Sequence, residues 1–244
     1  MIKTLELILH PVPQPEKGDT GLRFTDILFG FVLSELFIRL GNQDWTHPFG
    51  IVLLQLLVGT NLVLGSWLGF RLSLYRSSYQ IKFFNLPLFR FLVDQLMLVL
   101  YFRIAILTPG PDSKKTLPPL PQLAETTVSL VVYVFVLYAF WDLLGLWMAK
   151  AKIKTANSTR TPRYLALKEG KPTNQEQAVN WVGIWITIAA LILLSGIWFF
   201  VRSSGCAFRA PIPIRSLLCT FVVLLAYRLC KEIRTSYQLL QQQG

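Results

Sequence analysis

The chain of 244 residues is too apolar for an ordinary soluble domain: 53% of its residues are hydrophobic, 15% are charged, and its mean hydropathy is +0.48. Soluble domains carry about a quarter charged residues. The net charge of +11 would suit a nucleic-acid ligand. Apolar blocks of membrane-spanning length separate the basic segments, however, so we interpret the charge as a topology signal and expect no nucleic-acid partner.

The N-terminal segment 1–21 is expected to lie in the cytoplasm or at the membrane surface. Its apolar stretch Met1–Leu9 is short, and three prolines, Pro11, Pro13 and Pro15, follow it without a small-residue cleavage site. These features argue against a cleaved signal peptide. The first span would then act as its own insertion signal.

Six apolar blocks predict an all-α, polytopic membrane protein with a bundle of six transmembrane helices. A helix of about 20 residues rises about 30 Å, the thickness of the hydrocarbon core. The blocks run over Leu22–Gly41, Pro48–Phe70, Leu88–Thr108, within Thr126–Ala149, Trp181–Val201 and Ile214–Ile233. The chain thus divides into the segment 1–21, a four-helix part 22–149, a basic loop 150–180, two helices in 181–234 and a polar tail 235–244.

The distribution of Lys and Arg predicts that both termini are cytoplasmic. The connection 42–47 has neither residue, and the Pro-rich connection after the third span has only Lys114 and Lys115. The other side of the predicted bundle receives most of the cations, above all in the loop 150–180. Cytoplasmic loops carry such an excess, which favours the inner or plasma membrane of a cell.

The loop 150–180 has a second interpretation beside topology. Its cations would attract anionic lipid headgroups, so we name anionic lipids at 150–171 as candidate partners in addition to the bilayer itself. A docking site for a protein partner is the alternative. At the end of the loop, Thr173 to Glu176 has the spacing of a capping box that opens the fifth helix.

Charged residues within the predicted spans form pairs at helical spacing. A charge in mid-membrane costs about 2.5–3.5 kcal/mol on insertion scales, so such groups face protein and pair with one another. Residues three or four apart share a helix face. The pairs predicted in this way are Arg23 with Asp26, Glu35 with Arg39, and Arg90 with Asp94.

The depth of each charge predicts two polar layers. The inner layer would contain Arg23, Asp26, Arg90, Asp94 and Asp142, and the outer layer Glu35, Arg39 and Arg103. Asn61 and Gln55 of the second span would join either layer. We expect these layers to hold the first, third and fourth spans together, and they serve either as structural ion pairs or as an ion or proton pathway.

Catalytic and cofactor chemistry has no support in the sequence. The two histidines, His10 and His47, lie outside the spans, and no zinc-protease, nucleophile-elbow, Walker or dinucleotide motif occurs. We expect no catalytic residue, metal or cofactor, and we interpret the three cysteines as packing residues.

The stretch RFTDILFGFVLSELF, Arg23–Phe37, resembles the first-helix signature of the lysosomal and prokaryotic six-helix potassium channels. That family has an Arg-x-x-x-Phe-Ser-Asp motif followed by an apolar helix. Phe24, Thr25 and Asp26 match its Phe-Ser-Asp part, with Thr in place of Ser. The stretch Val63–Tyr75 is similar to the family's second helix, in which a Trp precedes a basic run.

The chain departs from the family at several points. Thr20 stands where the family has its Arg, the second span lacks the family's histidines, and Glu35 and Arg39 occur in a helix that the family keeps apolar. The resemblance implies a homo-oligomeric cation channel with a pore lined by the first helix, in which Phe24, Thr25 and Asp26 tie that helix to its neighbours. The alternative is a non-catalytic interaction or signalling protein that docks a partner through its basic loop.

Overall fold

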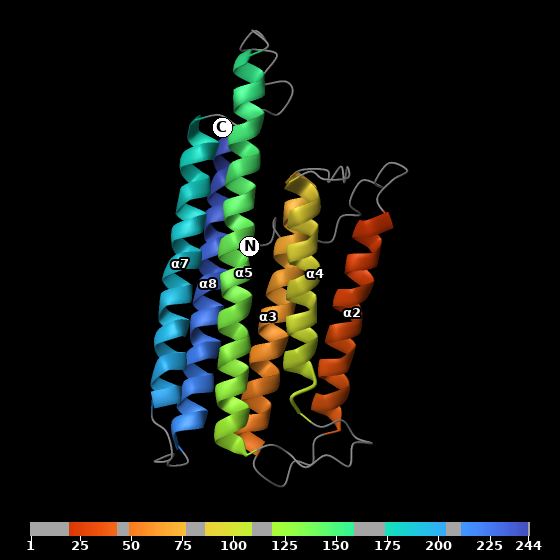
Figure 1. Cartoon of the computed structure of the whole chain (residues 1–244), viewed down its shortest axis with the longest axis vertical. Coiled ribbons are helices and arrows are strands. Elements are labelled where there is room, and N and C mark those ends of the chain that lie inside the picture. Colours follow the sequence, from red (N-terminus) through yellow and green to blue (C-terminus); the bar gives the residue numbers. More distant parts are fainter. Residues whose placement is uncertain are drawn as a thin grey trace.

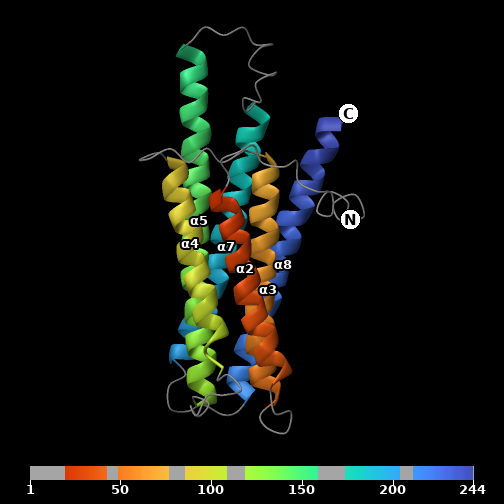
Figure 2. The ribbon, with the colours of Figure 1, turned by 90° about the vertical axis from the view of Figure 1, so that its right-hand side faces the viewer.

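The computed structural model describes residues 20–42, 49–76, 86–108, 119–158, 174–203 and 211–243, and its described part is all-α, with no strand (Figure 1). The helices are α2 (Thr20–Gly41), α3 (Phe49–Arg76), α4 (Leu86–Ala105), α5 (Leu120–Ser158), α7 (Asn174–Ser203) and α8 (Pro211–Gln243). They lie side by side, and consecutive helices run in opposite directions (Figures 1 and 2).

Four of these helices are long and apolar enough to cross a membrane. The apolar segments are Gly50–Arg71 in α3, Pro121–Trp147 in α5, Trp181–Ser203 in α7 and Ile212–Arg234 in α8. α2 and α4 have the length of a span, with 22 and 20 residues, but each contains several charged residues. The chain therefore has the make-up of a membrane-embedded protein.

α3 continues past its predicted end at Phe70 to Arg76, and two other helices extend further still. α5 begins at Leu120 and continues to Ser158, past the predicted start of the basic loop, and α8 continues through the predicted tail to Gln243. The extensions at the C-terminal ends, 150–158 of α5 and 235–243 of α8, contain no Gly or Pro. They include Ala, Lys, Leu and Gln, which are good helix formers. Thr173, the predicted capping residue, lies outside the described residues. So do residues 1–19 and residues 159–173 of the predicted loop 150–180.

The helices pack as a bundle in which α8 contacts α3, α5 and α7, and α4 bridges α5 and α2. α2 lies at the edge, against α3 and α4 (Figure 1). The predicted packing of the first, third and fourth spans is therefore correct for α2 with α4 and for α4 with α5. It is wrong for α2 with α5, which is not among the main packing pairs, because α3 and α4 together cover the inner side of α2.

Gly59 of α3 marks the closest approach of three helices. A Cβ at this position would lie 3.2 Å from Ile104 Cγ2 of α4 and 3.2 Å from Leu36 Cδ2 of α2. Leu36 and Ile104 are almost completely buried. The small residue lets α2 and α4 pack against α3 at one level, which is the role that glycines have in membrane helices.

Large apolar side chains cover the outside of the bundle. Phe31 of α2, Ile192 and Phe199 of α7, and Ile233 of α8 expose 58%, 65%, 69% and 68% of their surfaces. A water-soluble protein rarely exposes contiguous apolar surface on this scale. The pattern fits a bundle whose outer faces contact lipid or a second subunit.

Candidate functional site

Thr25 and Asp26 attach α2 to its neighbours. Asp26 Oδ1 accepts a hydrogen bond from Trp67 Nε1 at 3.1 Å, and its Oδ2 lies 2.9 Å from Arg71 Nη2, both on α3. Gln95 Nε2 of α4 donates to the buried Thr25 Oγ1 at 3.1 Å. We name Thr25, Asp26, Trp67, Arg71 and Gln95 the α2 anchor.

This arrangement differs from the predicted pairing within α2. The sequence analysis paired Asp26 with Arg23, and the side chain of Arg23 is not among those that the structure describes. It also ended the second span at Phe70, which placed Arg71 in the loop that follows. α3 continues to Arg76, so Arg71 is a helical residue that faces Asp26. The neighbouring Phe24 does not join the anchor, since 53% of its surface is exposed.

The outer layer contains one ion pair. Glu35 Oε1 lies 2.5 Å from Arg39 Nη2 and 2.9 Å from Arg39 Nε, and Arg39 is buried. This is the predicted pair at i and i+4. Arg103 does not join it: the residue is exposed on α4, and no ion pair within the described part of the chain links it to Glu35.

Arg90, Asp94 and Trp141 form a contact between α4 and α5. Asp94 is 7% exposed, and the positive charge of Arg90 acts on its carboxylate. Arg90 Cζ lies 3.5 Å from the centre of the Trp141 ring, a cation–π geometry. The three residues therefore lie at the contact of α4 with α5 and not with α2.

Asn61 does not complete either predicted layer. Its Nδ2 is buried and has no hydrogen-bond partner among the described residues. Gln55 of the same helix has a structural role instead, since its Nε2 donates to Ile104 O at 2.7 Å and its Oε1 accepts from Thr108 Oγ1 at 2.5 Å. Gln55 thereby fixes the end of α4.

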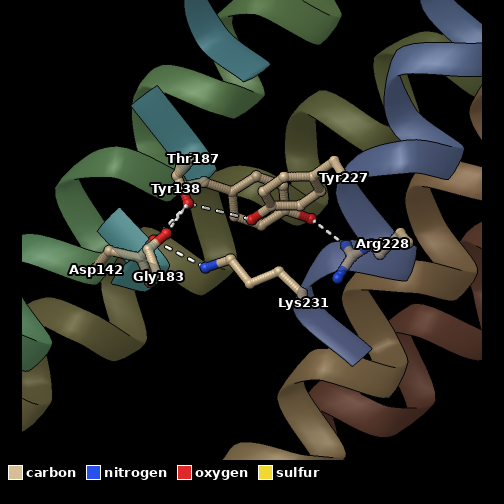
Figure 3. Close-up of polar contacts among 7 residues, drawn as sticks. All are labelled: Tyr138, Asp142, Gly183, Thr187, Tyr227, Arg228 and Lys231. Carbon is tan, nitrogen blue, oxygen red and sulfur yellow. Dashed lines mark hydrogen bonds and ion pairs between the residues drawn. The ribbon is translucent and has the colours of Figure 1, made fainter. Parts of the chain in front are cut away.

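A cluster of hydroxyl groups around one arginine lies at the centre of the bundle. We define this central cluster as Ser66, Tyr101, Tyr138, Tyr227 and Arg228, from α3, α4, α5 and α8. Tyr101 OH lies 2.7 Å from Ser66 Oγ and 2.9 Å from Tyr138 OH, and Ser66 also bonds directly with Tyr138. Arg228 Nη2 donates to Tyr138 OH at 2.9 Å (Figure 3). It also donates to Ser66 Oγ at 3.2 Å.

Arg228 fits into the cluster because of two glycines and two aromatic rings. A Cβ at Gly65 would collide with its side chain, and one at Gly69 would lie 3.3 Å from Nη1. Its Cζ lies 5.6 Å from the centre of the Tyr138 ring and 5.5 Å from that of Tyr227. Gly65 and Gly69 of α3 thus leave space for the side chain of Arg228, whereas Gly59 of the same helix allows α2 and α4 to approach.

Asp142 joins α5 to α7 and α8. Its Oδ2 lies 3.0 Å from Lys231 Nζ and accepts a hydrogen bond from Thr187 Oγ1 at 2.6 Å (Figure 3). Thr187 also donates to Gly183 O at 3.0 Å, and its Oγ1 lies 3.4 Å from Tyr227 OH. The side chain of Asp142 therefore turns toward the last two helices, and its printed bonds do not link the fourth span to the first and third.

The sequence reasoning missed the central cluster and the role of α8. It singled out none of Tyr138, Tyr227, Arg228 and Lys231 as a site residue. A signal was present, since Arg228 lies six positions before the end of the apolar segment at Arg234. A cation at that depth needs polar partners inside the protein.

Among the described residues, no group of three His, Cys, Asp or Glu side chains is placed to hold a metal ion. Comparison of the chain with models of known protein families, with curated proteins and with solved structures finds no match in any of the three.

Proposed function

We propose that the chain is a membrane protein with six transmembrane helices and both termini on the cytoplasmic side. Two of its most apolar helices, α3 and α5, run in the same direction (Figures 1 and 2). The chain must return across the membrane between them, and α4 is the helix that lies along this path. Its 20 residues rise about 30 Å, which is enough to cross.

The charges of α2 and α4 do not oppose this assignment. Asp26 meets Arg71 and Glu35 meets Arg39, Asp94 is buried at the contact of α4 with α5, and Arg103 lies in the last turn of α4. Paired charges that face protein are the form in which ionisable residues occur within membranes. The excess of Lys and Arg on the side where α3, α5 and α8 end supports a cytoplasmic location for that side, in the inner or plasma membrane.

We further propose that the protein is a non-enzymatic, homo-oligomeric cation channel whose pore is lined by the exposed face of α2. One observation carries this proposal: α2 lies at the edge of the bundle, and its exposed face is apolar or small. That face comprises Phe24, Ile27, Phe31, Ser34 and Ile38, at successive spacings of three and four. Such a stripe suits contact with identical helices around an axis.

The inward rotation of the charges supports the same proposal. Glu35 and Arg39 depart from the apolar first helix of the channels that the sequence resembles. In this bundle they bond with each other, and Arg39 is buried. The presence of these two charged residues therefore leaves the exposed face of α2 apolar.

Ion flux in liposomes tests this function. We would replace the three native cysteines and place one cysteine at Ile27, Phe31 or Ile38, with Ile192→Cys on the exposed face of α7 as the matched control. A charged thiol reagent should block potassium flux through the α2 variants and leave the control unchanged. Asp26→Ala should lower flux by loosening the α2 anchor. Absence of flux in the unmodified protein, or equal block at Ile192, would contradict the channel.

The alternative, a docking protein, is favoured by the extension of α5. This helix continues for about three turns beyond the apolar segment that ends at Trp147. The extension contains Lys150, Lys152 and Lys154, and the anionic lipids proposed as partners of 150–171 would bind there as well. Replacing these lysines with Gln should leave flux intact in a channel. If the chain is a docking protein, the unmodified protein should conduct no ions, and the same substitutions should abolish its biological effect.

A further inference from the structure

Arg228 differs from three other cations of the bundle. Arg39, Arg71 and Lys231 each contact a carboxylate. Arg228 contacts two hydroxyl groups and two aromatic rings, and no carboxylate of the described residues lies within 4 Å of it. A half-buried cation in an apolar segment is costly when no anion balances it.

Two of the three guanidinium nitrogens have no hydrogen bond within the described part of the chain. Nη2 makes both hydrogen bonds, to Ser66 and Tyr138. Nε and Nη1 have no hydrogen-bond partner in the described part of the chain, yet the side chain is only half-buried. Nε–H points to the same side as the bonded Nη2, whereas Nη1 lies on the other side of the guanidinium, so Nη1 is the donor that remains for an anion.

Nη1 is directed toward the membrane boundary. Nε lies beside Gly65, and Nη1 lies beside Gly69, one turn further along α3. The apolar segment of α3 ends two residues later, at Arg71. The guanidinium thus extends from within the bundle toward the level at which lipid headgroups begin, as long cationic side chains do near the ends of spans.

We propose that Arg228 binds the phosphate of an anionic phospholipid at the contact between α3 and α8, in the leaflet on the side where these two helices end. Nη1 donates to a phosphate oxygen, and the missing side chain of Gly69 leaves the space for this approach. A lipid is favoured over a free phosphate by the neighbours. Leu64, Leu225 and Leu229, next to these residues on α3 and α8, are exposed apolar side chains that offer a surface to acyl chains.

Thermal unfolding of the full chain in nanodiscs tests the proposal. Phosphatidylglycerol is added in steps to a phosphatidylcholine bilayer, and phospholipid phosphorus retained after a detergent wash is counted as a second measurement. The unfolding midpoint of the unmodified protein should rise by several degrees. Arg228→Gln should lose both the rise and the retained lipid. Arg215→Gln removes the same charge from an exposed position near the other end of α8 and should keep both.

A second variant keeps the test decisive if Arg228→Gln does not fold. Gly69→Leu covers Nη1 and leaves the bonds of Nη2 in place, so it should also lose the lipid response. Gly145→Leu, at a position with no atom within 4 Å of a Cβ, is its control. Equal responses in Gly69→Leu and the unmodified protein overturn the site. A comparable rise with inorganic phosphate in a phosphatidylcholine bilayer overturns the lipid assignment. Neither result depends on whether the protein conducts ions.

Discussion

The carboxylate of Asp26 shows how single residues are accommodated in this bundle. Its two oxygens contact different side chains of one neighbouring helix, Trp67 and Arg71. Arg71 Cζ in turn lies 5.5 Å from the centre of the Trp67 ring. The charge is therefore balanced across the α2–α3 interface, with a tryptophan hydrogen bond that a purely apolar interface would not need.

At the residue scale, Gly65→Ala should destabilise the protein. The added methyl would overlap Nε, Cζ and Cδ of Arg228, so the guanidinium must leave Ser66 and Tyr138. Overpacking of this kind costs about 1–3 kcal/mol. The free energy of unfolding in bicelles, measured by steric trapping, checks the effect.

Gly145→Ala is the matched control for this substitution, because nothing lies within 4 Å of a Cβ at Gly145. It should leave the unfolding free energy unchanged or raise it slightly, since Ala is the better helix former. Equal effects of the two substitutions would show that Arg228 does not occupy the space at Gly65.

At the scale of elements, α8 is held by contacts to three helices at one level. Arg228 bonds with α3 and α5, and Lys231, one turn later, bonds with Asp142 of α5. Thr187 of α7 donates to the same carboxylate oxygen as Lys231. The polar side chains of α8 therefore fix its rotation about its own axis, while its opposite face remains apolar.

A double-mutant cycle on Asp142→Asn and Lys231→Met measures the link between α5 and α8. Each substitution alone leaves one partner of a half-buried ion pair without the other, so each should destabilise the fold more than the pair changed together. We expect a coupling energy of roughly 0.5–3 kcal/mol from unfolding in bicelles. Strictly additive effects would mean that the contact contributes nothing to stability.

The sequence predicted local features of this molecule better than contacts between helices. The pair of Glu35 and Arg39 follows from spacing along one helix, and the apolar segments of four helices follow from composition. The partners of Asp26 and Asp142 depend on how each helix is rotated against its neighbours, which spacing within a helix does not contain. Tyrosine and serine are common in apolar segments, so their presence alone does not predict the central cluster. Only their contacts with one another and with Arg228 in the structure identify it.

At the scale of the whole molecule, the antiparallel bundle divides its ends into two groups. One end holds the starts of α2, α4 and α7 and the ends of α3, α5 and α8 (Figure 1). The connections between the helix ends of this group contain many Lys and Arg residues, and the connections at the opposite end contain few. The direction of each helix and the charge of each connection thus support one orientation in the membrane.

Single cysteines in a cysteine-free background test this orientation. An impermeant maleimide applied to intact cells should label Asn42→Cys and Ser203→Cys, which follow α2 and α7 at one end of the bundle. It should label Ser158→Cys, at the end of α5, only after lysis. Equal labelling of positions 42 and 158 in intact cells would exclude the proposed six crossings.

α8 is one unbroken helix of 33 residues, about 50 Å long, and roughly its last two turns lie beyond the apolar segment that ends at Arg234. A rigid rod of this kind acts as a lever. Because the helix is unbroken from Arg228 to Gln243, we expect a tilt of the projecting turns to displace Arg228 against α3 without unfolding a loop.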